Sequence, residues 1–430
     1  MPLRARTQTV ALSALVGLVA SPGIPAKASD TTPATTTGHA DVVSETPVDW
    51  TPHVLDGSVR AVAEGADVIV AGGNFERIQE PDSESELTQR HLFAFERETG
   101  ELLADFRPTL DGEVRSLAVV DDTVYVGGFF TSVNNVAQRG ITQLSLSDGS
   151  LVSDFAETAI DDGRVYGIAE HEGQLYLGGS FSSVNGEARR GIARLDAATG
   201  EVDPDFDLPI SELRAGFLRV HNLALSPDGE RLLINGPFLE VAGQSRPQIA
   251  MIDTAGEEAR LSSWSTNAFT ADCGAPNMHT YLHQMEFAPD SSYFVVVTTG
   301  SAHERPGLCK TASRWEVTDN PEAEPTWVNE TGGDSLYSVA VTERAVYVGG
   351  HQRWLDNPEG HNSAGPGAVD REGIGAIDPE SGTALPWNPG RQRGHGAEEL
   401  LATEDGLFVG SDTEWISGRY QPRLALLPLD

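Results

Sequence analysis

Seven side chains that could bind a ligand or exchange a proton recur at intervals of about 50 residues. They are Arg60, Arg115, Tyr166, His221, His283, Tyr337 and Glu399. Arginine, tyrosine, histidine and glutamate side chains donate hydrogen bonds, carry charge or titrate. If they converge, they would form the polar cluster that is typical of a small-ligand site. The alternative interpretation is that they are the ordinary solvated lining of a channel.

The same residues allow a second hypothesis, an extracellular hydrolase or lyase. His221, His283 or His351 would be the general base and Glu399 the acid, because these groups titrate near neutral pH when they are partly buried. A histidine and a glutamate about 3 Å apart would favour this enzyme. The sequence contains no G-x-S-x-G nucleophile elbow.

No metal site and no cofactor are predicted. His279 and His283 are four positions apart, which on an extended strand separates them by about 13 Å. The H-x-H, H-E-x-x-H and Asp-rich calcium-loop patterns are absent from the sequence.

The candidate residues sit in a repeated unit. The stretches VIVAGGNF from Val68, VYVGGFF from Val124 and LYLGGSF from Leu175 are alike, and each repeat contains four short apolar or alternating runs separated by Gly, Asp and Asn. Such runs predict four β-strands per unit. An aromatic residue marks the fourth strand of each unit: Phe106, Phe155, Phe206, Trp264, Trp327, Trp387 and Trp50. Seven units are therefore expected.

The seventh unit is divided between the two ends of the chain. The sequence ends at Asp430, soon after the third strand of that unit, and Pro47–Pro52 carries the missing outer-strand pattern. We therefore expect an all-β, seven-bladed β-propeller with four antiparallel strands per blade, closed by an N-terminal outer strand in the last blade. Closure leaves only short, protected sheet edges.

The repeats resemble the delta-sixty family of bacterial propeller repeats, a domain of unknown function. The resemblance is best over residues 111–208, where the G-G-x-F, V-N-G, R-x-x-A-R-L-D and T-G-x-V-D-P-x-F elements are nearly intact. It implies a propeller fold and brings no catalytic motif to this chain.

Two other repeated features are interpreted as structural. One arginine precedes the third strand of each unit, and we expect it to bond backbone carbonyls in the turn between the second and third strands. The set is Arg90, Arg139, Arg190, Arg246, Arg314, Arg371 and Arg423. Gly-Gly pairs such as Gly72-Gly73 and Gly127-Gly128 are expected to mark tight turns at strand ends.

Long loops are expected on one common face, together with the candidate ring. They span 74–90, 301–314, 351–371 and 265–280, and the third adds His351 and Trp354 to the candidate ligand-binding residues. Cys273 and Cys309 are the only cysteines and lie in two of these loops, so a disulfide would pin this face.

The N-terminus has the pattern of a secretory signal. Arg4 and Arg6 precede an apolar stretch, and Ala26-Lys27-Ala28 is an A-x-A cleavage site. We therefore expect a signal peptide over 1–28, a disordered Thr/Pro-rich tether over 29–46 and one propeller domain over 47–430. The mature protein would be secreted.

The net charge of the chain indicates which classes of binding partner are disfavoured. A formal net charge of −35 disfavours nucleic acid and anionic membrane surfaces. The leading hypothesis is a monomeric, non-enzymatic binding or scaffold protein. Its channel-mouth face would recognise an extracellular glycan, peptide or envelope component.

Overall fold

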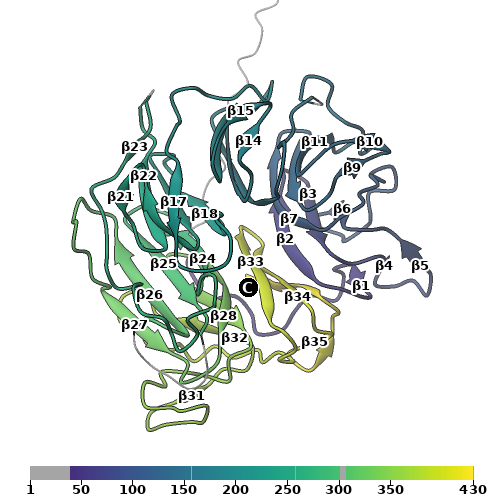
Figure 1. Cartoon of the computed structure of the whole chain (residues 1–430). Coiled ribbons are helices and arrows are strands. Elements are labelled where there is room, and N and C mark those ends of the chain that lie inside the picture. The colour runs from purple at the N-terminus through teal and green to yellow at the C-terminus, as the bar shows by residue number, and fades with distance from the viewer. Residues whose placement is uncertain (1–38, 156, 257, 301–306, 430) are drawn as a thin grey trace, which may run out of the picture. The chain divides into compact units, whose positions relative to one another are not determined.

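The computed structural model describes residues 39–155, 157–256, 258–300 and 307–429, and every regular element in them is a β-strand (Figure 1). The all-β fold class is confirmed. The expected signal peptide lies outside the described residues. Within the described ranges, no helix is long and apolar enough to cross a membrane.

Seven of the thirteen sheets in the described chain follow one another, and in each of them the strands pair antiparallel in chain order. The first three are β2 (Val59–Glu64), β3 (Val68–Gly73) and β6 (Leu92–Glu96); β7 (Val114–Val120), β8 (Thr123–Gly128) and β11 (Ile141–Ser145); and β12 (Val165–His171), β13 (Gln174–Gly179) and β16 (Ile192–Asp196). The fourth is β18 (Asn222–Leu225), β19 (Arg231–Asn235), β22 (Ile249–Asp253) and β23 (Arg260–Leu261), and the fifth is β24 (Leu282–Phe287), β25 (Tyr293–Thr298), β26 (Thr311–Glu316) and β27 (Trp327–Glu330). The last two are β28 (Leu336–Val341), β29 (Val346–Gly350) and β32 (Ile374–Ile377), and β33 (Ala397–Thr403), β34 (Gly406–Ser411) and β37 (Leu424–Pro428).

The expected fourth strand is regular in only two sheets, as β23 and β27. In four others it shrinks to single antiparallel bridges: Phe95–Leu102, Leu144–Leu151, Leu195–Val202 and Ile377–Ala384. The aromatic residues that mark it are nevertheless buried. Phe106, for example, packs with Val70 of β3 and Val126 of β8. The outer aromatics therefore fill the core between neighbouring sheets.

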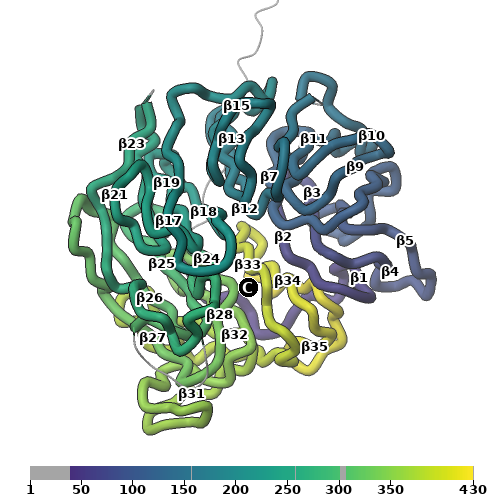
Figure 2. The backbone as a smooth tube through the Cα atoms, in the orientation of Figure 1, coloured from purple at the N-terminus to yellow at the C-terminus, as the bar shows by residue number. Residues whose placement is uncertain are grey.

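The first strands of successive sheets contact one another, and the first strand of the last sheet contacts that of the first. β2 contacts β7, β7 contacts β12, and the series continues through β18, β24 and β28 to β33, which contacts β2. In Figure 2 the yellow tube of β34 accordingly lies beside the purple tube near β2.

The N-terminal segment lies along the last sheet. The amides of Ser44 and Val48 donate to the carbonyls of Pro428 (2.7 Å) and Leu426 (3.0 Å) in β37. Residues 47–52 form no regular strand, in contrast to the expected outer strand. Trp50 packs against the hydrophobic cluster that residues of the first and last sheets form together.

The expected disordered tether does not extend to residue 46. His39 and Val43 are buried, and the Val43 amide donates to the Tyr347 hydroxyl at 2.9 Å. The backbone N–H of Asn388 donates to the Glu45 carboxylate at 2.9 Å. Residues 39–46 are therefore part of the folded domain, and residues 29–38 lie outside the described part.

In five of the seven sheets described above, the segment that precedes the first strand pairs with the loop between the second and third strands. Short hairpins and single bridges make these pairings. The short strands are β1 (His53–Val54), β4 (Arg77–Gln79), β5 (Glu86–Thr88), β9 (Ser132–Val133), β10 (Val136–Ala137), β14 (Ser183–Val184), β15 (Glu187–Ala188), β17 (Ile210–Leu213), β20 (Phe238–Val241), β21 (Gln244–Ser245), β30 (Trp354–Leu355), β31 (Val369–Asp370), β35 (Trp415–Ile416) and β36 (Arg419–Tyr420). β1 pairs with β4 and β17 with β20, and single bridges join Leu110 to Val133, Ile160 to Val184 and Arg391 to Ile416. Five connections therefore share a face with these loops, as predicted.

The Gly-Gly pairs mark close backbone approach rather than tight turns. A Cβ on Gly73 would lie 2.0 Å from the carbonyl oxygen of Ser58, and one on Gly128 would lie 2.3 Å from that of Glu113. Neither glycine has a positive φ. The first glycine of a pair faces the next sheet instead: a Cβ on Gly72 would lie 2.5 Å from a methyl group of Val114.

The arginine column is only partly structural. Arg246 and Arg371 are buried and donate to the carbonyls of Ser262 and Leu385 beside the outer strand. Arg314 and Arg423 also donate to backbone carbonyls. The prediction is wrong for three members, Arg90, Arg139 and Arg190, which are exposed.

In the first three sheets the buried position lies one residue earlier, and glutamine can fill it. Gln138 donates to the carbonyl of Ile141, and Arg189 donates to that of Asp203.

Candidate functional site

Most first strands contain a bulge near their start, and the bulge selects the candidate residues. The pairing register skips one residue between Val59 and Ala61, and the same shift recurs in β7, β12, β28 and β33. The skipped residues are Arg60, Arg115, Tyr166, Tyr337 and Glu398. The register shift of β24 contains His283, and His221 directly precedes β18. A bulge re-aims a side chain out of the ladder, so equivalent positions around the fold present one side chain each.

These side chains form a continuous circuit of contacts, which we call the mouth ring: Arg60, Glu113, Arg115, Phe129, Tyr166, His221, His283, Tyr337, His395 and Glu398. Glu113 pairs with Arg60 at 2.7 Å and with Arg115 at 3.1 Å. The ring centroids of Phe129–Tyr166, Tyr166–His221, His221–His283, His283–Tyr337 and Tyr337–His395 are 4.9, 6.1, 5.3, 4.7 and 5.1 Å apart. Arg115 lies 5.7 Å from the Phe129 ring, and His395 Nδ1 contacts Glu398 Oε1 at 3.0 Å. An ion pair between Glu398 and Arg60 completes the circuit.

The structure corrects one member of the predicted column. Glu398, not Glu399, occupies the bulge of β33 and joins the mouth ring. Glu399 is the next residue, so its side chain belongs to the position filled by Ala61 in β2. Burial raises the pKa of Glu399 to about 8, although a hydrogen bond with Gln284 and the charge of Arg115 oppose the shift. Burial also raises the pKa of Glu286 well above its usual value.

Of the two loop residues, His351 contacts a member of the mouth ring and Trp354 does not. The Tyr337 hydroxyl lies 2.9 Å from His351 Nδ1, and Arg393 donates to the His351 carbonyl at 3.0 Å. Trp354 lies in the β30–β31 hairpin under the guanidinium of Arg353, at 4.3 Å, and contacts no member of the ring in the described part of the chain.

The histidines of the mouth ring differ in charge. Burial lowers the pKa of His221 well below its usual value, and His283, Arg219 and Arg115 lower it further. Burial lowers the pKa of His283 to about 4, against the opposing charge of Glu398. For His395 the hydrogen bond to Glu398 raises the pKa. At neutral pH, His221 and His283 are therefore uncharged imidazoles, and a hydrogen-bond partner is lacking for the buried His221 Nδ1 among the described residues.

The sequence interpretation missed a second column, two positions before the bulge in the first strands. It contains Glu113, Arg164 and Arg219, whose carbonyls approach the second glycine of the neighbouring strand. Because side chains alternate along a strand, residues two apart share a face. The same period-two rule applied to the predicted column would have found them.

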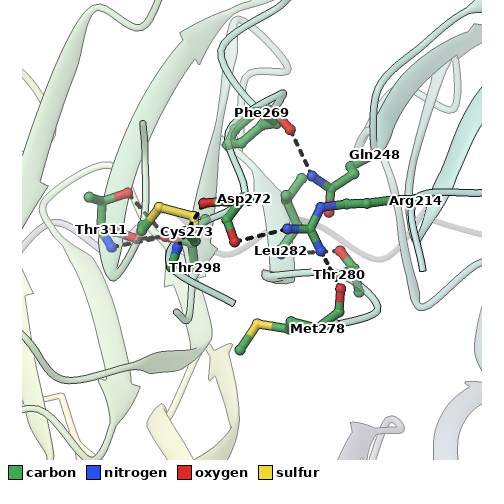
Figure 3. The surroundings of a disulfide bond; sticks show 12 residues. Arg214, Gln248, Phe269, Asp272, Cys273, Met278, Thr280, Leu282, Thr298 and Thr311 are labelled. Atoms are coloured by element: carbon green, nitrogen blue, oxygen red, sulfur yellow. Dashed lines mark hydrogen bonds between the residues drawn. A yellow bond between two sulfur atoms is a disulfide. The ribbon is translucent and has the colours of Figure 1, made fainter. Parts of the chain in front are cut away.

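The disulfide forms as predicted and holds a loop beside the mouth ring. Cys273 and Cys309 are bonded, with their Cα atoms 5.6 Å apart. Figure 3 shows Arg214 reaching from the fourth unit to the same loop, where it donates to the carbonyl of Asp272 at 2.9 Å and to that of Met278. Further along this loop, His279 Nδ1 accepts a hydrogen bond from Arg219 at 3.1 Å.

The predicted catalytic pairing is not the one that forms. No contact joins Glu399 to His221, His283 or His351 among the described residues, and the histidine–glutamate pair at 3.0 Å is His395–Glu398. Within the same ranges, no three His, Cys, Asp or Glu side chains gather as a metal ion would require.

The chain was compared with protein families, curated proteins and solved structures. The family model "Domain of unknown function (DUF5122) beta-propeller" matches residues 173–206, which span β13 to Phe206. No curated protein matches the chain. Two of the similar solved structures are each 12% identical to the chain in sequence. The computationally designed Ika8 protein has a TM-score of 0.47 over 90% of this chain and 100% of its own, and the WD40 β-propeller domain of Doa1 has 0.46 over 86% and 94%. Residues 173–206 therefore match a repeat of this β-propeller family.

Proposed function

We propose that the chain is a closed seven-bladed propeller whose mouth ring binds a ligand outside the cell, as a non-enzymatic binding or scaffold protein. The carrying observation is the mouth ring. It takes charged, aromatic and imidazole side chains from all seven sheets and joins them in one circuit. A purely structural ring would need no such variety from sheet to sheet.

Closure is supported by contacts that repeat between the last and first sheets. A Cβ on Gly410 of β34 would lie 3.0 Å from a methyl group of Val59, as one on Gly127 would lie 2.9 Å from Val165 between the second and third sheets. The N-terminal segment adds backbone bonds to β37.

Truncation tests this closure. A chain beginning at residue 39 should keep the stability of the parent, and one beginning at residue 55 should lose cooperative unfolding. Equal unfolding curves for the two truncations would refute closure through this segment.

Export is supported by the leader pattern of residues 1–28. N-terminal sequencing of the protein recovered from the culture medium of an expressing bacterium should give Ser29 as the first residue. Recovery of Met1 inside the cell would contradict export.

Ligand binding is tested by a thermal-shift screen against glycans, peptides and cell-wall fragments. A ligand at a hundred times its dissociation constant stabilises by about 2.7 kcal/mol. The shift should disappear in His283→Ala or Tyr337→Ala and persist in His361→Ala and Tyr420→Ala, which change exposed residues outside the ring. A shift that survives both ring substitutions would place the ligand elsewhere.

A second candidate function is a hydrolase or lyase at the same ring. The His395–Glu398 contact at 3.0 Å favours it. Against it, Glu398 has a lowered pKa: the His395 hydrogen bond and Arg60 outweigh the burial that would raise it, so the carboxylate stays charged. Turnover of any ligand found in the screen, lost in Glu398→Gln, would establish the enzyme.

A further inference from the structure

Three guanidinium groups gather on one aromatic pair of the mouth ring. Phe129 and Tyr166 contact each other edge to face, 4.9 Å between centroids. Arg164 and Arg115 lie 4.6 and 5.7 Å from the Phe129 centroid, and Arg219 lies 5.6 Å from that of Tyr166. We call Arg115, Arg164 and Arg219 the arginine sector.

The arginine sector has too little negative charge to balance it. Among the described residues Glu113 is the one carboxylate paired with Arg115, and it is shared with Arg60. No carboxylate of the described residues lies within 4.0 Å of Arg164 or Arg219. In a chain with a net charge of −35, arginines readily find acidic partners. Two that find none, beside a third, repel one another at a cost that a bound anion would remove.

Arg219 is the strongest sign that a partner is missing. Its exposed fraction is 8%, its Nε is buried without a hydrogen-bond partner among the described residues, and its guanidinium donates to His279 Nδ1 rather than to a carboxylate. Burial lowers the pKa of this guanidinium, and the charge of Arg115 lowers it further. A buried cation without a counter-ion is costly, so such groups are normally paired.

We infer that the arginine sector is an anion-binding subsite of the mouth ring, which takes an oxyanion group, a carboxylate or a phosphate, of a small-molecule ligand. The planar guanidinium fork matches either group with two parallel hydrogen bonds. Phe217 lies beside it, 47% exposed and 4.6 Å from the Arg219 guanidinium, and offers an apolar contact to the rest of the ligand. The inference rests on the proposed ligand-binding function and specifies its chemistry.

Isothermal titration calorimetry of the full chain tests the subsite with inorganic phosphate, glucuronate and neutral glucose. At least one of the two anions should bind, and the anion that binds identifies the group. Arg164→Gln should weaken its binding about tenfold, because a charge-assisted hydrogen bond is lost from an exposed side chain. The matched control Arg139→Gln, which removes an exposed arginine outside the ring, should leave the dissociation constant unchanged.

Arg219→Lys distinguishes the effect of the planar guanidinium fork on anion binding from that of the positive charge. It should retain the melting temperature of the parent and weaken anion binding, because lysine keeps the charge and loses the planar fork. Absence of binding of both anions, or equal binding by Arg164→Gln and the parent, would overturn the subsite. If a neutral ligand binds and is lost in Tyr337→Ala while the anions do not bind, the proposed function stands and the anion subsite falls.

Discussion

Arg60 and Glu398 form an ion pair across 338 positions of the chain, between the first strand of the first sheet and the first strand of the last. Both side chains are largely buried, with exposed fractions of 20% and 10%. Each has a second partner, Glu113 for Arg60 and His395 for Glu398. The pair thus joins the first and the last of the seven sheets within the mouth ring.

Removal of this carboxylate should destabilise the protein. We expect Glu398→Gln to lower the free energy of unfolding by about 2–3 kcal/mol, because it leaves a partly buried guanidinium with one partner fewer. The pKa of His395 should fall toward its ordinary value, as measured by NMR titration. The control Glu404→Gln changes an exposed carboxylate paired with Arg97 and should cost less than about 1 kcal/mol. Equal losses in urea unfolding would contradict the central role of Glu398.

Glu399 should make stability fall as the pH rises. Its folded pKa of about 8 lies above that of an unfolded glutamate, so its contribution is full below about pH 4.3 and is lost as the pH rises through 8. His283 acts in the opposite sense, because its folded pKa is lowered to about 4 and its contribution is lost as the pH falls from 6.5.

Glu399→Gln isolates the first effect. The free energy of unfolding of the variant, minus that of the parent, should increase between pH 5 and pH 9 by a few kcal/mol. A difference that does not change with pH would show that Glu399 does not hold a proton in the fold.

Gly73→Ala should be severely destabilising. The new Cβ would lie 2.0 Å from a backbone oxygen of Ser58, so the bulge that aims Arg60 must move. We expect a loss of more than about 3 kcal/mol in thermal or urea unfolding. Gly256→Ala is the control, because the nearest described atom beyond its chain neighbours would lie 3.8 Å from the new Cβ, so the substitution should change stability by less than about 0.5 kcal/mol. A well-folded Gly73→Ala protein with native stability would contradict the close approach.

Removal of the disulfide should reduce both stability and anion binding. The bond closes a separation of 36 residues, which corresponds to about 4 kcal/mol in the chain-entropy model. The double substitution Cys273→Ser and Cys309→Ser should also free the loop that holds His279 against Arg219. We therefore expect a lower melting temperature and weaker binding of the anion. Unchanged binding after loss of the disulfide would show that the loop does not position Arg219.

The repeat landmarks predict the strands and the fold well, because turn glycines and buried apolar runs recur at fixed spacing. The exact site was harder to predict. A bulge inserts one residue, so the alignment that selected Glu399 was off by one position, and Glu398 took its place. The arginine column failed for a related reason: its members were aligned by residue type rather than by distance from the third strand, which selected Arg139 instead of Gln138.

The N-terminal segment shows a different limit. Residues 39–46 look like a polar linker by composition. In the structure, however, the buried Val43 and hydrogen bonds from the amides of Val43 and Ser44 hold them against the sheets. Bonds to a partner nearly 400 positions away leave no periodic trace in the local sequence. Only the aromatic pattern at Trp50 indicated that this end belonged to the last sheet.

The bonds of Ser44 and Val48 to β37 also constrain the order in which parts of the protein can fold during synthesis. Synthesis proceeds from the N-terminus, so Ser44 and Val48 cannot form these bonds until residues 424–428 have been made. Each intermediate sheet can pair its own strands as it emerges, because its hairpins are local. The sheet of β33, β34 and β37 and the Arg60–Glu398 pair can form only after residues 397–428 have been made, so a chain terminated before them would expose an unpaired edge that quality-control proteases can recognise.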